Sequence, residues 1–217
     1  ISNFKLDASS DTLLLENDPD LKLYRENNEK YGSSDFLIVT FTPNKELLSE
    51  STIDSIKGIV EKISSLDGVD NVLSLLDVPL LESQSSLSLS EVADNISTLN
   101  ADNFDINLAK RVFSSNSVYQ NLLISEDLST TAFQITLKRN LAYEKLISDR
   151  YSIYDSFSND KDEKLSKINQ LIQLEKNNIS LNDAKLVSSL RDLLSSYESL
   201  GQLFLGGGAM ITVDTIK

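Results

Sequence analysis

The chain has 217 residues and carries 33 acidic against 20 basic side chains, a net charge of −13. This balance argues against binding to nucleic acids or anionic membrane surfaces, since both attract lysine and arginine. The sequence contains no cysteine and no histidine, which excludes disulfides, thiolate sites and catalysis by Ser-His or Cys-His pairs. A hydrophobic share of 40% is enough for a core. An enzyme that uses only carboxylates, or one that depends on lysine, is still compatible with this composition. Our expectation is an acidic folded domain that is not an enzyme and has no catalytic, cofactor-binding or metal-binding residues.

The first third of the chain predicts a helix and then a βαβ unit. Asp18-Pro19 is typical of a helix start, and the helix should end near Tyr31, before Gly32. A β-branched and aromatic run follows at 35–42; because it is apolar on both faces, it predicts a strand buried on both sides. Isoleucines at helical spacing then predict a helix over 51–66, and a second apolar strand is expected at 69–75. The order of elements predicts parallel strands joined by a helix.

The middle of the chain predicts an exposed connection and a β-hairpin. Residues 80–100 are rich in serine and lead into a short helix at 90–96, and a further helix is expected over 103–113. Segments 119–125 and 131–138 predict the two strands of a hairpin. The second strand alternates apolar and polar side chains, which indicates one buried face and one solvated face.

Residues 140–200 predict helices. A break is expected near 158–160, because serine, asparagine and aspartate favour caps and turns. Asn177-Asn178 predicts a second turn, so that two amphipathic helices would pack as an antiparallel hairpin. Their apolar stripes suggest an apolar ligand or partner surface as an alternative to simple packing. Its candidate residues are Leu165, Ile168, Leu171, Val187, Leu190 and Leu194.

The end of the chain predicts a strand at 202–205, a glycine run and a helix beginning near Met210. Gly206, Gly207 and Gly208 are not a phosphate-binding loop, since the lysine and the serine or threonine of that motif do not follow. They predict a bend that requires positive φ or close backbone approach. A hinge between this domain and a following helix is the alternative function.

Together these elements predict an α+β fold: a ferredoxin-like, split βαβ mixed sheet with helices on one face and a helical hairpin insertion. We expect one domain with five parts. They are residues 1–79 with the βαβ unit, 80–118 with the serine-rich connection and short helices, 119–139 with the β-hairpin, 140–200 with the helical region, and 201–217 with the final strand and glycine bend.

Six segments resemble the exporters of the resistance-nodulation-division superfamily, of the bacterial lipid and hopanoid type. They are FKLDASSDTL at 4–13, NDPDL at 17–21, YGSSDF at 31–36, LDGVDNV at 66–72, DVP at 77–79 and LFLGGGAMI at 203–211. The resemblance implies the first of two porter domains, cut from between the first and second transmembrane helices of a longer chain. No apolar run here approaches the roughly 20 residues of a membrane span.

The resemblance further implies a proton-driven exporter on the periplasmic face of a bacterial inner membrane. The proton relay would lie in transmembrane helices outside this sequence. The partners implied are those helices, the second porter domain of the same chain and a homo-oligomer, with an apolar or lipid-like substrate. The alternative is an extracytoplasmic ligand-binding sensor domain of a membrane receptor. The flanking sequence discriminates between them, because a sensor would be followed by a cytoplasmic signalling module.

Overall fold

The computed structural model describes residues 20, 23, 35–81, 97–101, 104–120, 122–156 and 159–215. Within these ranges the chain forms four strands in a single sheet, together with five helices. The strands are β1 (Phe36–Pro43), β2 (Val69–Leu73), β3 (Thr131–Leu137) and β4 (Gly201–Gly206). The helices are α2 (Glu50–Ser64), α4 (Ile106–Ser115), α5 (Leu141–Asp155), α6 (Lys161–Ser195) and α7 (Gly208–Thr215).

The sheet has the strand order β2-β3-β1-β4, and each neighbouring pair is antiparallel. Strands β1 and β2 are therefore parallel to each other, but β3 lies between them. The helix α2 joins these two strands, and α5 and α6 join β3 to β4 across β1 in the same way. Two such split βαβ units make the ferredoxin-like topology, which confirms the predicted fold class.

The core lies between one face of the sheet and two helices, α2 and the C-terminal half of α6. Alternation along β1 and β3 turns every second side chain toward these helices, because the period of a strand is two. The isoleucine stripe of α2 meets this face. The strand and α2 residues with no exposed surface are Leu37, Val39, Phe41, Ile53, Ile56, Ile59, Ile63, Phe133 and Ile135.

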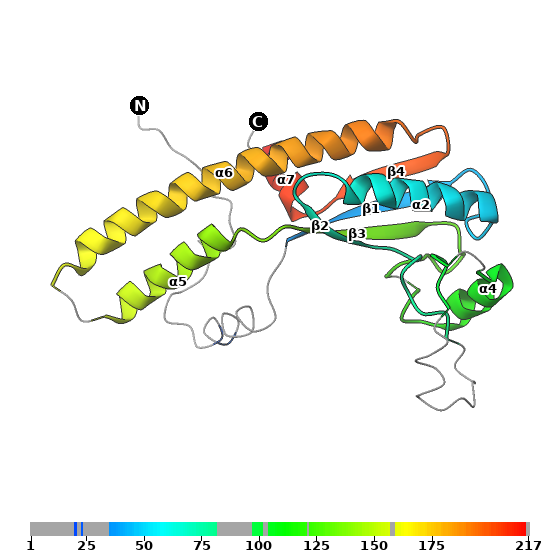
Figure 1. The fold of residues 1–217 in the computed structure, drawn as a ribbon, viewed down its shortest axis with the longest axis horizontal. Coiled ribbons are helices and arrows are strands. Elements are labelled where there is room, and N and C mark those ends of the chain that lie inside the picture. The colour runs from blue at the N-terminus through cyan, green and yellow to red at the C-terminus, as the bar shows by residue number, and fades with distance from the viewer. Residues whose placement is uncertain are drawn as a thin grey trace.

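Helix α5 and the first part of α6, residues 161–181, form an arm that extends away from the sheet (Figure 1). An antiparallel hairpin was predicted with its turn at Asn177-Asn178, but the two helices that pair are α5, which ends at Asp155, and α6, which begins at Lys161. Helix α6 continues through both asparagines for 35 residues, or about 52 Å. The chain from 140 to 200 contains no glycine or proline, and an asparagine costs a helix only about 0.7 kcal/mol. The burial of Ile168 and Ile172 before the asparagines, and of Leu186 and Val187 after them, outweighs a cost of this size.

The first strand of the predicted β-hairpin is also absent. The described residues of this segment, 119–120 and 122–125, belong to no strand, and the backbone N–H groups of Leu123 and Ile124 both donate to the carbonyl of Tyr119, at 3.0 and 3.2 Å. Only Ile124 pairs with Thr131, in an isolated bridge. The helix predicted at 90–96 lies outside the described residues, as does that at 18–31 apart from positions 20 and 23. The other predicted strands and helices are present, with boundaries shifted by a few residues.

Candidate apolar site on the open sheet face

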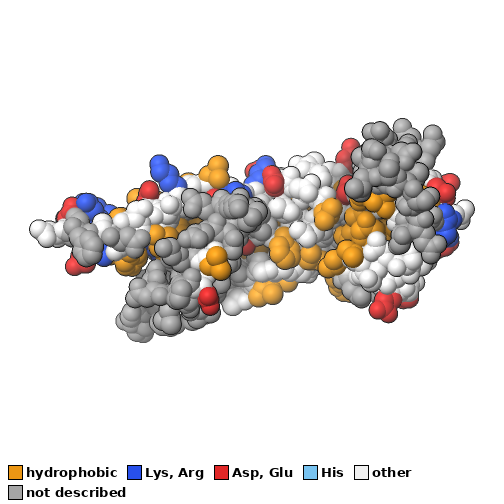
Figure 2. All heavy atoms as spheres, turned by 90° about the horizontal axis from the view of Figure 1, so that it is seen from below, with side chains coloured by type: hydrophobic (Ala, Val, Ile, Leu, Met, Phe, Trp, Pro, Cys, Tyr) orange, Lys and Arg blue, Asp and Glu red, His pale blue; other side chains and the backbone are white. Residues whose placement is uncertain are grey.

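The sheet face opposite α2 and α6 is apolar over part of its area. Ile38, Ala132 and Leu73 belong to this face, and Phe36 exposes 50% of its surface there. The prediction that the first strand is buried on both sides is therefore wrong, because the helices in the described part of the chain cover only one face. Figure 2 shows hydrophobic side chains grouped toward the half of the molecule that carries α4. The sequence signal for this site is a strand that is apolar at both its inward and its outward positions.

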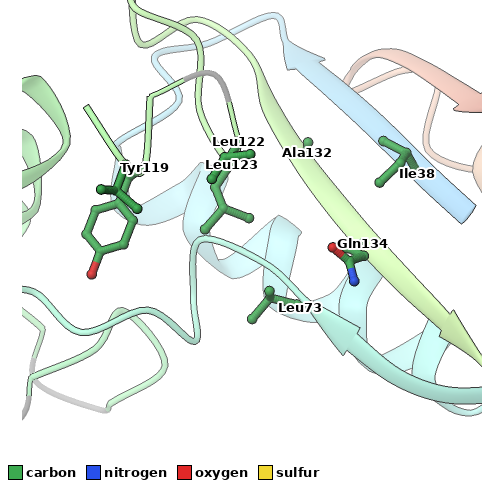
Figure 3. A pocket seen from close by; sticks show the side chains of 8 residues that line it. Ile38, Leu73, Tyr119, Leu122, Leu123, Ala132 and Gln134 are labelled. Atoms are coloured by element: carbon green, nitrogen blue, oxygen red, sulfur yellow. The ribbon is translucent and has the colours of Figure 1, made fainter. Parts of the chain in front are cut away.

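A cavity of about 210 Å³ lies at this face (Figure 3). Its floor is set by strand register, because Gln134 pairs with Ile38 on one side and with Leu73 on the other. Its wall comes from the turns after α4. The lining residues are Ile38, Leu73, Val118, Tyr119, Leu122, Leu123, Ala132 and Gln134.

The wall is held in place by contacts to α4 and β3. The Tyr119 hydroxyl donates to the carbonyl of Pro79 at 3.0 Å, and its ring meets Phe113 edge to face, with 5.7 Å between centroids. The carbonyl of Leu123 accepts from the N–H of Ala132 at 2.9 Å. These contacts place the wall beside the sheet while Val118 and Leu122 remain exposed. These contacts therefore fix the position of the wall relative to the sheet.

The lining of the cavity suits an apolar group and has few side chains that could take part in catalysis. Gln134 and Tyr119 supply its polar side-chain atoms, and the Tyr119 hydroxyl is already used by Pro79. A dry cavity of about 150 Å³ can hold benzene, whereas whole-ligand pockets exceed about 300 Å³. The cavity thus fits one ring or the end of an aliphatic chain. In the ranges the structure describes, no group of three or more carboxylates could hold a metal ion.

The predicted glycine run contains one position that requires glycine. Gly207 has φ of 125°, and a Cβ there would lie 2.9 Å from the Phe36 carbonyl oxygen. A Cβ on Gly206 or Gly208 would meet nothing within 4 Å. The predicted bend between β4 and α7 is therefore present and centred on Gly207. Its use as a hinge stays a prediction.

The six residues predicted as an apolar surface do not lie together. Val187, Leu190 and Leu194 are buried in the core under the sheet, so they are closed to a ligand or partner. Leu165 and Ile168 lie on the arm, where Ile168 is buried and Leu165 partly exposed, and Leu171 exposes 51% of its surface. One helix stripe therefore contributes to two separate packing regions. The cavity residues were not among the sequence-predicted candidates.

Two charged contacts mark where α6 meets its neighbours. Burial, and to a smaller extent the charge of Asp35 just before β1, together raise the pKa of Asp183 to about 6. Farther along α6, the Arg191 guanidinium donates to both carboxylate oxygens of Asp214 at 2.7 and 3.1 Å. This pair fixes α7 against α6. Because Asp214 follows the glycine bend, the pair also limits the directions in which α7 can leave the sheet.

No protein-family model, curated protein or solved structure matches the chain. Among the described residues, no helix has both the length and the hydropathy to cross a bilayer.

Proposed function

We propose that this chain is the extracytoplasmic porter domain of a proton-driven exporter of the resistance-nodulation-division type. In this proposal the open sheet face forms part of the path for apolar or lipid-like substrates. The domain makes and breaks no bonds. It lies on the periplasmic side of a bacterial inner membrane, next to the transmembrane helices and the second porter domain of the same polypeptide.

The observation that carries the proposal is the apolar cavity on the uncovered face of the sheet. Contiguous exposed apolar surface on a soluble domain marks a site for a ligand or another protein surface. This one combines a cavity with exposed Val118 and Leu122 among its lining residues. A path for apolar substrates requires such a surface, whereas domains without a ligand or partner rarely expose apolar surface of this kind.

The ends of the sheet give further support. Ile38, near the start of β1, pairs with Gly206 at the end of β4. The chain therefore enters β1 and leaves β4 at the same end of the sheet. A domain inserted between two helices of one bilayer requires this arrangement. It would also suit a sensor domain, so it supports a membrane-anchored loop and not transport in particular.

Binding of cis-parinaric acid, a fluorescent fatty acid, tests the path. Ala132→Phe places a ring on the floor of the cavity and should weaken binding at least fivefold. Thr136→Phe is the matched control, because it adds the same ring on the same face of β3 outside the lining and should stay within twofold. If both variants bind the fatty acid as tightly as the unchanged chain, the proposal that the cavity forms part of the substrate path is wrong.

A ligand-binding sensor domain is the second candidate, because a cavity of about 210 Å³ also suits a small apolar ligand. The sequence that flanks this chain in its gene separates the two. An exporter predicts a long series of hydrophobic spans and a second porter-like segment. A sensor predicts one span on each side and a cytoplasmic signalling module.

A further inference from the structure

The arm carries an apolar stripe that α5 does not cover. Leu171, Leu174 and Leu181 expose 51%, 61% and 62% of their surfaces. With exposed Asn178 they follow spacings of 3, 4 and 3 residues, which places all four on one face of α6. Ile168 and Ile172, the buried residues of this part of α6, lie on a different face. We call Leu171, Leu174, Asn178 and Leu181 the arm stripe.

The arm lacks a core of its own. Of its apolar side chains, only Ile168 and Ile172 are buried, and neither belongs to the main core. Helix α5 has no buried side chain among its described residues. Most helical stability in proteins comes from packing of an apolar face. A further helical surface against the arm would therefore stabilise it.

We propose that the arm stripe pairs with the arm stripe of a second copy of this chain, as a short parallel coiled coil. The stripe has the a and d spacing of such a pair, with leucine at both d positions and asparagine at one a position. In a parallel, in-register pair, Leu174 and Leu181 each meet their own copy. Asn178 then meets Asn178, and a single asparagine at an a position favours this register and a two-stranded assembly.

Charge also favours a second copy over other occupants. Between positions 161 and 181, α6 carries four lysines and three acidic residues, whereas the whole chain has a net charge of −13. Two arms can therefore approach each other, while most other surfaces of two copies repel. The positions that flank the stripe carry a single charge, that of Glu175, beside Gln170, Asn177 and Asn182. No like-charge pair forms across a parallel interface. This inference does not depend on the exporter role.

Cysteine cross-linking tests the pairing directly, because the chain contains no cysteine. Leu174→Cys lies on the stripe, and Gln173→Cys is an exposed control one residue away on another face. Under mild oxidation of the purified chain, Leu174→Cys should form a disulfide-linked dimer at least tenfold faster than Gln173→Cys. Equal rates would overturn the proposal.

Three further measurements sharpen the result. Adding Leu171→Asp to Leu174→Cys should lower the rate to that of the control with an unchanged circular dichroism spectrum, since Leu171 is half exposed; an unchanged rate would overturn the proposal. Mixing Leu171→Cys with Leu181→Cys chains should give no excess of mixed dimer, whereas an excess would mean antiparallel pairing and overturn the register. Sedimentation with phosphatidylglycerol vesicles should leave the chain in solution. Vesicle binding together with control-level cross-linking would assign the stripe to a lipid surface instead.

Discussion

Helix α6 passes through two regions that are packed very differently. Its C-terminal half places Leu186, Val187, Leu190 and Leu194 in the core under the sheet, beside α2 and α7. Its first half shares the arm with α5 and buries only Ile168 and Ile172. The backbone is helical throughout, so the difference between the halves lies in side-chain packing. Helix length alone therefore says little about local stability, and the arm is expected to open at a lower free energy than the body.

The largest effect is expected from breaking the packed half. Leu190 has no exposed surface, so Leu190→Ala should lower the free energy of unfolding by about 2–5 kcal/mol, through lost apolar burial and the cavity that remains. Leu174→Ala makes the same change on the arm, where the side chain is 61% exposed in the single chain, and should cost less than about 0.5 kcal/mol at protein concentrations too low for pairing of two copies. Urea unfolding followed by circular dichroism measures both. Equal losses would contradict the contrast between the halves.

The sequence predicted the packed region better than the arm. In the body the periodicities of 2 and 3.6 residues agree with the tertiary structure, as in β1, α2 and β3. In the arm, Asn177-Asn178 predicted a turn from local preference, and the burial of α6 side chains on either side of the asparagines overrode it. Local preference agreed with the structure at Gly68 and Gly207, where positive φ leaves few alternatives.

The candidate site was harder to predict than the fold, for a related reason. Its floor depends on the pairing of Gln134 with Ile38 and Leu73, which joins strands far apart in the sequence. Its wall is a segment that was predicted to be a strand. The apolar outer positions of β1 were visible in the sequence, but they were assigned to burial on both sides. The sequence could have corrected the assignment of β1 to burial on both sides only if the predicted helices had been counted and found too few to cover both faces of the sheet.

A smaller loss is expected where the body ends at the glycine bend. Gly207→Ala would place a Cβ 2.9 Å from the Phe36 carbonyl oxygen, in a residue with φ of 125°. Strain of this kind costs about 1–3 kcal/mol, and the melting temperature should fall accordingly. Gly206→Ala and Gly208→Ala are matched controls, because their Cβ positions are open. A similar fall for all three variants would mean that the run as a whole, and not the backbone conformation of Gly207, is required.

The smallest effect concerns Asp183, which lies between exposed Leu181 and buried Leu186, where the arm joins the body. Its pKa is about 6 in the folded chain against an ordinary 3.8, mainly because of burial and then because of the charge of Asp35. The folded state therefore holds the proton more tightly, and this carboxyl lowers stability as pH rises from about 4 to 6. The full difference corresponds to about 3 kcal/mol, which solvent screening at a partly exposed group reduces to about 1 kcal/mol.

Asp183→Asn should remove this loss. The free energy of unfolding of the variant, relative to the unchanged chain, should rise by about 1 kcal/mol between pH 4 and pH 7, because an amide does not ionise. Asp192→Asn, which removes a carboxylate at an exposed position on the same helix, is the matched control. If Asp183→Asn behaves like this control, the junction of arm and body is more solvated than the packing around Leu186 implies. The two halves of α6 would then be separated by a solvent-exposed segment and not by a continuous packed surface.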